Sequence, residues 1–153
     1  MTRRGRRAAL ALLIGMLLLT LTGCVGNART TGAYRGKAHL SAEAAISSLE
    51  TALLAVQTSA KGNLFGSVLE VTLSQAEDDF GSVQQQFDSI QPPNTSEADK
   101  LRSRLDDLLT RGASTLADLR IAARRDQQDL MVHTAQDVQP LVNKLDALAQ
   151  ATS

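Results

Sequence analysis

Apolar side chains recur at alternating steps of four and three residues along segment 69–90, and this spacing constrains the fold more than any other feature of the chain. The positions are Leu69, Leu73, Ala76, Phe80, Val83, Phe87 and Ile90. Such steps place side chains on one face of a helix. Strands need apolar residues at every second position, and no segment of the sequence shows that alternation. The segment is therefore predicted to be an amphipathic helix that must bury its apolar stripe against another element of the fold.

Three further segments carry a helical stripe. The apolar positions are Ile46, Leu49, Leu53 and Val56 in the first, Leu101, Leu105, Leu108, Leu116 and Leu119 in the next, and Leu130, Ala135, Val138, Leu141, Leu145 and Leu148 in the last. The connections are short, which makes consecutive helices antiparallel neighbours. The sequence predicts an all-α, up-down-up-down four-helix bundle over residues 39–153. The alternative is a three-helix bundle with an irregular C-terminal segment after Asp129.

Residues at the segment ends indicate where these helices begin and stop. Ser41 is a suitable N-cap for the first helix, and Gly62 supplies the left-handed residue that follows a helix end. Pro92-Pro93 ends the second helix because proline has no N–H to donate. Pro140 lies inside the last stripe, so that helix either kinks there or a new segment begins with proline at its first helical position, N1.

The N-terminal segment has a different character. Four arginines within residues 3–7 precede an apolar run from Ala8 to Leu21, and Leu21-Thr22-Gly23-Cys24 follows. As a helix the fourteen-residue run would span about 21 Å, less than a bilayer core of roughly 30 Å. A basic region, a short apolar region and small residues before the cleavage point are typical of an export signal. The last four residues resemble the lipobox of bacterial lipoproteins, in which small residues precede an obligatory cysteine.

That resemblance implies a diacylglycerol group on the Cys24 thiol, cleavage after Gly23 and a mature chain that starts at Cys24. Two acyl chains are sufficient for stable anchoring. The implied location is the exported side of the cell membrane, on the outer face of the cytoplasmic membrane or in the periplasm. Residues 1–23 are then the cleaved signal peptide, and residues 24–38 the lipidated cysteine with a flexible tether. A non-lipidated signal peptide or an uncleaved anchor are the alternatives.

The charge and the cysteine content restrict the partners and the chemistry. Removal of residues 1–23 takes away four of the sixteen basic residues and no acidic ones, which leaves a net charge of −4. Nucleic acid is excluded as a partner because proteins that bind nucleic acid present a basic surface. Cys24 is the only cysteine, so no intrachain disulfide is available. The expected partners are the membrane, through the lipid, and an envelope protein.

One constellation suggests a metal site. Asp129, His133 and Asp137 recur every four residues and are expected on one helix face, where imidazole and carboxylate groups bind divalent transition metals. A solvated acidic face around a histidine is the other interpretation. The haem-ligand pairs and Glu-x-x-His motifs of cofactor-binding bundles are not found in the sequence. No cofactor besides the lipid is predicted.

A second stripe on the 69–90 helix and its preceding turn suggests a surface for a protein partner. Leu64, Val68 and Val71 lie on a different face from the main stripe, and the sequence predicts a small apolar patch rimmed by Arg124, Arg125 and Asp129. The alternative is that the stripe packs on a neighbouring helix. No catalytic constellation is recognisable, so the predicted function is a non-enzymatic interaction or scaffold module. A small-ligand or metal-binding bundle is the alternative function.

Overall fold

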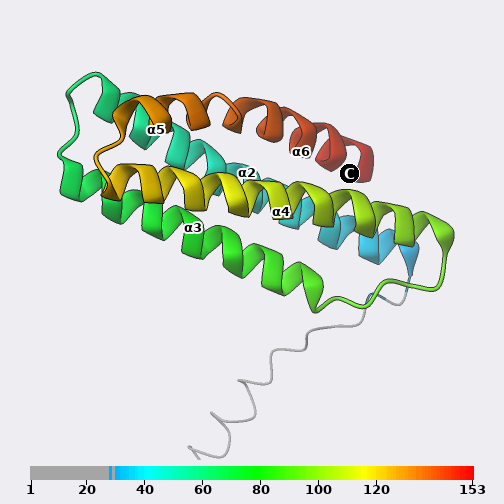
Figure 1. The fold of residues 1–153 in the computed structure, drawn as a ribbon. Coiled ribbons are helices and arrows are strands. Elements are labelled where there is room, and N and C mark those ends of the chain that lie inside the picture. Colours follow the sequence, from blue (N-terminus) through cyan, green and yellow to red (C-terminus); the bar gives the residue numbers. More distant parts are fainter. Residues whose placement is uncertain (1–27, 29) are drawn as a thin grey trace, which may run out of the picture.

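The computed structural model describes Ala28 and residues 30–153, so the predicted signal peptide and Cys24 lie outside the described residues. Within that range the chain forms five helices, α2 (Thr31–Ala60), α3 (Gly66–Asp88), α4 (Ser96–Arg124), α5 (Gln128–Ala135) and α6 (Val138–Thr152). The short α5 and α6 follow one another along α4 and together occupy the position of a fourth helix (Figure 1). The predicted four-helix bundle is confirmed, and the three-helix alternative is wrong.

The first helix begins earlier than predicted. The Thr30 hydroxyl accepts a hydrogen bond from the Ala33 N–H at 3.1 Å, so Thr30 rather than Ser41 is the N-cap. Tyr34 and Ala38 are fully buried. The prediction that residues 24–38 form a flexible tether is therefore wrong for 31–38, which belong to the bundle. Glycine, threonine, alanine and basic residues make up most of this segment, and they give no sustained apolar period.

Small side chains on α2 determine how closely the helices of the bundle pack. The alanines that α2 buries are Ala38, Ala42, Ala45, Ala52 and Ala55. Small residues at a contact let helix axes approach closely, and α2 contacts α3, α4, α5 and α6. Among the described helices, α3 has no close contact with α5 or α6. The bundle is thus flattened, with α2 and α4 close across one diagonal.

The three largest core side chains belong to α2 and α3. Tyr34, Phe80 and Phe87 are fully buried, and the Tyr34 and Phe87 rings lie 5.8 Å apart between centroids. The Phe80 ring packs directly on the backbone of Gly112, where an added Cβ would lie 2.9 Å from Cε2 and closer still to Cζ. Gly112 therefore does not interrupt the predicted stripe of α4, because it receives an aromatic ring from α3.

The helix ends agree with the predictions in part. Gly62 has φ +73°, its N–H donates to the Ser59 carbonyl, and the Asn63 N–H donates to the Thr58 carbonyl, which is a Schellman ending. A new helix, α6, does begin before Pro140, but this proline is its third residue and not its first. A missing N–H still costs little there, because the first four N–H groups of a helix have no intrahelical partner. Leu130 is half exposed and Met131 is buried, so the prediction of Leu130 as a core residue is wrong.

Within the part of the chain that the structure describes, no helix is both long and apolar enough to cross a membrane.

Candidate functional site

The predicted metal face is not assembled as expected. Asp129 and His133 are exposed on α5, but α5 ends at Ala135 and Asp137 lies in the break before α6. Across residues 30–153, no three His, Cys, Asp or Glu side chains converge in a group that could hold a metal ion. The prediction of one continuous helix is wrong, because α5 ends at Ala135 and a turn at Gln136 and Asp137 precedes α6.

The α2–α3 turn and the α4–α5 connection define one end of the bundle. Ser59 of α2, Gly66 of α3 and Asp126 of the α4–α5 connection line a common cleft of about 80 Å³. Figure 1 shows this end opposite the end that holds the start of α2 and the C-terminus of α6. We call the first the distal end and the second the proximal end. The Gly62 turn and the connection over residues 124–129 therefore lie at the same end, as the up-down-up-down topology requires.

Exposed apolar side chains gather at the distal end on the outer side of α2 and α3. Val68 is 45% exposed and Val71 is 69% exposed, whereas Leu64 packs against the core. Val71 shares a groove of about 310 Å³ with Thr51 of α2. The alternative interpretation, burial on a neighbouring helix, therefore holds for Leu64 but not for the two valines.

Two further side chains extend this surface that the sequence interpretation missed. Phe65, at the N-cap of α3, is 82% exposed, and Leu54 of α2 is 65% exposed. Leu54 lies one helical turn after Thr51 on α2, and Val68 lies one turn before Val71 on α3. Leu54 and Val68 are therefore nearer to the Gly62 turn than Thr51 and Val71, which line the groove. Leu54, Phe65, Val68 and Val71 are called the distal patch below.

The predicted arginine rim does not surround the distal patch. Arg124 and Arg125 are exposed at the end of α4. The residues of α3 that face this connection are Gly66, Leu69 and Glu70. At about 100° per residue, Val68 and Val71 project from roughly the opposite side of α3. Of the predicted patch, only Val68 and Val71 therefore share an exposed surface.

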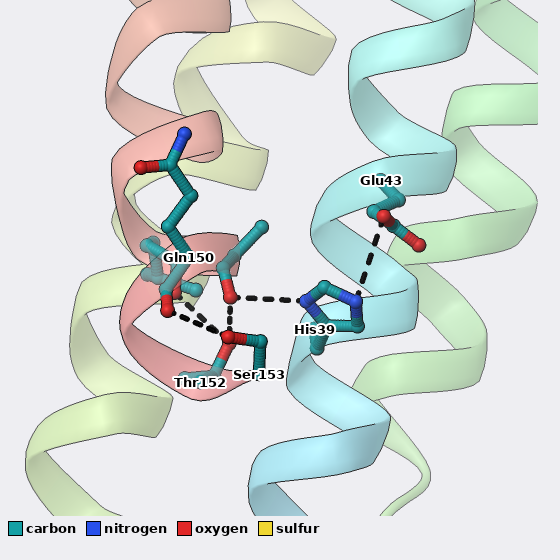
Figure 2. A network of polar contacts seen from close by, with 7 residues as sticks. His39, Glu43, Gln150, Thr152 and Ser153 are labelled. Atoms are coloured by element: carbon teal, nitrogen blue, oxygen red, sulfur yellow. Dashed lines mark hydrogen bonds and ion pairs between the residues drawn. The ribbon is translucent and has the colours of Figure 1, made fainter.

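A larger groove, of about 430 Å³, lies between α2 and α6 and is lined by His39, Glu43 and Asp146 among others. Figure 2 shows the His39 ring between the two helices, with Nδ1 3.0 Å from the Ala149 carbonyl oxygen and Nε2 3.5 Å from Glu43 Oε1. A carbonyl only accepts, so Nδ1 carries the proton in this contact. The Glu43 contact is an ion pair only when the imidazole is protonated.

These contacts assign His39 a structural role at the end of α6. The last four carbonyls of a helix lack intrahelical donors. His39 serves the Ala149 carbonyl, which Thr152 Oγ1 also reaches, and Arg35 Nη2 donates to the Ala151 carbonyl at 2.9 Å. His39 and Arg35 are one turn apart on α2, which places them on the same face. Their i,i+4 spacing was visible in the sequence, but the carbonyls they serve were not.

A polar cluster lies beneath the α3–α4 connection. Arg102 donates to the carbonyls of Ile90 (3.0 Å) and Asp88 (3.2 Å), and its Nε is 3.5 Å from Asp106 Oδ2. The Tyr34 hydroxyl and Asp106 Oδ1 are buried without a hydrogen-bond partner among the described residues. Burial raises the pKa of both groups, and nearby Arg102 opposes the rise. Arg102 thus holds the α3–α4 connection onto α4.

No protein-family model, no curated protein and no solved structure matches this chain.

Proposed function

We propose that the protein is an exported lipoprotein, anchored through diacylglycerol on Cys24, whose bundle is a non-enzymatic interaction module of the cell envelope. The observation that carries this proposal is the sequence Leu21-Thr22-Gly23-Cys24 at the end of a basic and then apolar segment. Two acyl chains on one cysteine give stable membrane attachment. An envelope protein is the expected partner.

The dimensions of the chain support an orientation for this module. Six residue steps separate Cys24 from the N-cap Thr30, and they span at most about 22 Å when fully extended. The proximal end of the bundle therefore stays near the membrane surface. The distal patch lies at the other end, where it faces away from the lipid and toward proteins of the envelope.

The way the polar side chains are used supports a scaffold rather than a reaction site. Arg120 of α4 donates to both carboxylate oxygens of Glu77 on α3, and this hydrogen bonding raises the pKa of Arg120. Arg35 and His39 serve carbonyls of α6, and Arg102 serves the α3–α4 connection. Each of these side chains thus joins one helix to another helix or to a connection.

The substitution Cys24→Ala tests the anchor. It removes the thiol that accepts lipid, so labelling by radioactive fatty acid is expected to disappear and the unprocessed precursor to accumulate. Gel mobility and the label are the measurements. Thr22→Ala keeps a small residue beside Gly23 and serves as the control, which is expected to be labelled and processed like wild type. A wild-type chain without label would contradict the proposal.

A further inference from the structure

A groove of about 290 Å³ at the proximal end brings together the first turns of α2 and α4 and the last turn of α6. Arg35, Lys100 and Arg104 contribute its cations, and Glu97 contributes its carboxylate. Its remaining lining is mostly apolar and consists of Leu101, Leu148, Ala151 and Thr152. We call this the proximal groove. It lies at the end where the chain enters the bundle from Cys24.

The charge of the proximal groove is opposite to that of the domain. Three cations against one carboxylate leave the groove net positive, whereas residues 24–153 carry a net charge of −4. Glu97 only weakly offsets Arg35, since the two groups are 4.0 Å apart and Glu97 is 65% exposed. Lys100 and Arg104 lie one turn apart on α4 and are exposed.

The Arg35 guanidinium is held in place at this groove. Its Nη2 donates to the Ala151 carbonyl at 2.9 Å, and the side chain is 41% exposed. A guanidinium fixed at one nitrogen still presents other N–H donors, and its planar fork suits phosphate oxygens. Fixing the side chain beforehand lowers the entropy lost when an anion binds.

We propose that the proximal groove binds the phosphate headgroup of an anionic phospholipid. Arg35, Lys100 and Arg104 contact the phosphate, and the apolar lining, Leu101 and Leu148 included, receives the glycerol and the start of the acyl chains. This inference rests on the proposed anchor, which holds the groove within reach of the headgroups and so raises their effective concentration. Basic groups near an anionic leaflet are attracted to it, and the groove would fix the orientation of the bundle on the membrane.

The test is to add a ligand to the full-length protein in a neutral detergent and to measure the midpoint of thermal unfolding at each ligand concentration. The probes are dihexanoyl phosphatidylglycerol, dihexanoyl phosphatidylcholine and inorganic phosphate. A ligand that binds only the folded state raises the midpoint, and for a bundle of this size a shift of about 4 °C is expected with phosphatidylglycerol alone. The shift should shrink at high salt because the attraction is electrostatic.

A charge-matched pair of variants localises the effect. The groove variant is Arg35→Gln with Lys100→Gln and Arg104→Gln, and the distal control is Lys61→Gln with Arg124→Gln and Arg125→Gln. Each removes three positive charges. The phosphatidylglycerol shift should vanish in the groove variant and persist in the control. Lys100→Gln with Arg104→Gln, which keeps the Arg35 cap on α6, should lose most of the shift and covers the case of a groove variant that does not fold.

Three results would overturn the inference. These are no shift in wild type, an equal shift with phosphatidylcholine or with inorganic phosphate, and an equal loss in the distal control. The mass of Cys24 in the same sample reports the acyl group independently. Failure of the anchor and failure of the groove are therefore separate outcomes.

Discussion

At the scale of single residues, Gly112 and Phe80 show how an aromatic ring fixes its neighbour. Phe80 lies in the best apolar stripe of the sequence and is fully buried. The ring reaches α4 at Gly112, where no side chain stands in its way. Glycine in a helix costs up to about 1 kcal/mol relative to alanine, and here the close contact of ring and backbone offsets that cost.

Gly112→Ala is expected to lower the free energy of unfolding by about 1 to 2 kcal/mol. The added methyl group improves helix propensity but overpacks the buried ring, and overpacking costs more. Chemical denaturation measures the change. Gly81→Ala is the control, since nothing lies within 4 Å of its Cβ position, and it should stabilise the protein by about 0.5 to 1 kcal/mol. A stabilising Gly112→Ala would show that Phe80 can move away. Phe80→Leu should relieve the clash.

Asp106 gives a prediction on pH. Burial raises the pKa of its carboxyl, Arg102 lowers it, and Asp88 and Asp107 raise it. The folded state therefore holds the proton up to a higher pH than the unfolded state. Within the window between the two pKa values, the contribution of Asp106 to the free energy of unfolding falls as pH rises. Asp106→Asn removes this titration.

The measurement is the free energy of unfolding of wild type and Asp106→Asn from below the unfolded pKa of Asp to neutral pH. The variant should gain on wild type as pH rises through the window. Asp118→Asn, at an exposed position of the same helix, controls for the loss of one carboxylate. A difference between Asp106→Asn and wild type that stays constant with pH would contradict the burial argument.

At the scale of helices, α2 is the central element because its buried face is built from alanine. Ala38, Ala42 and Ala45 are fully buried and share the core with Leu49. Small residues permit the contacts of α2 with both α4 and α6. Hydrophobic patterning alone gives alanine little weight, yet these positions determine the distances between the helices.

Ala45→Leu is expected to cost about 1 to 3 kcal/mol in the free energy of unfolding, because a close-packed interior has no room for the added methylene groups. Ala44→Leu, one residue earlier and exposed, is the matched control. It should change stability by less than about 0.5 kcal/mol. Thermal or denaturant unfolding compares the two. Equal effects would show that the α2 interface is loosely packed.

At the scale of the whole molecule, the two ends of the bundle differ in character. The proximal end carries the proximal groove and the N-cap Thr30, which is the end of the bundle nearest to Cys24 along the sequence. The distal end carries the exposed apolar side chains Phe65 and Val68. A lipid-anchored module needs one end toward the membrane and one toward a partner, and this asymmetry agrees with the proposed orientation.

If the distal patch binds the proposed envelope partner, Val68→Asp is expected to abolish capture of that partner by the full-length protein. Circular dichroism and the unfolding midpoint should stay near wild type. Val68 is 45% exposed, so a charge there remains hydrated but interrupts an apolar contact. Crosslinking and affinity capture from membranes provide the measurement. Val132→Asp, at another exposed valine, should leave capture intact. Unfolding of Val68→Asp would mean that the valine is required for the core.

Local spacing and local backbone geometry were sufficient for part of this protein. The stripe from Leu69 to Phe87 predicted α3, because a helix repeats its contacts every three to four residues. Gly62 predicted the end of α2, because a positive φ at that position favours glycine. The exposed Val68 and Val71 were visible as a second stripe, although whether a helix covered them was not.

Tertiary packing decided the rest. Residues 31–38 belong to α2, and the helix is stabilised there by packing of the Tyr34 ring against Phe87. These two residues are far apart in the sequence. Met131 rather than Leu130 faces the core because α5 is a separate short helix whose rotation is set by its contacts with α4 and α2. Arg35 and His39 cap α6 for the same reason, since the carbonyls they meet are brought beside them only by the folded bundle. Periodicity reports which face of a helix is apolar, whereas the identity and distance of the neighbour are properties of the assembled core.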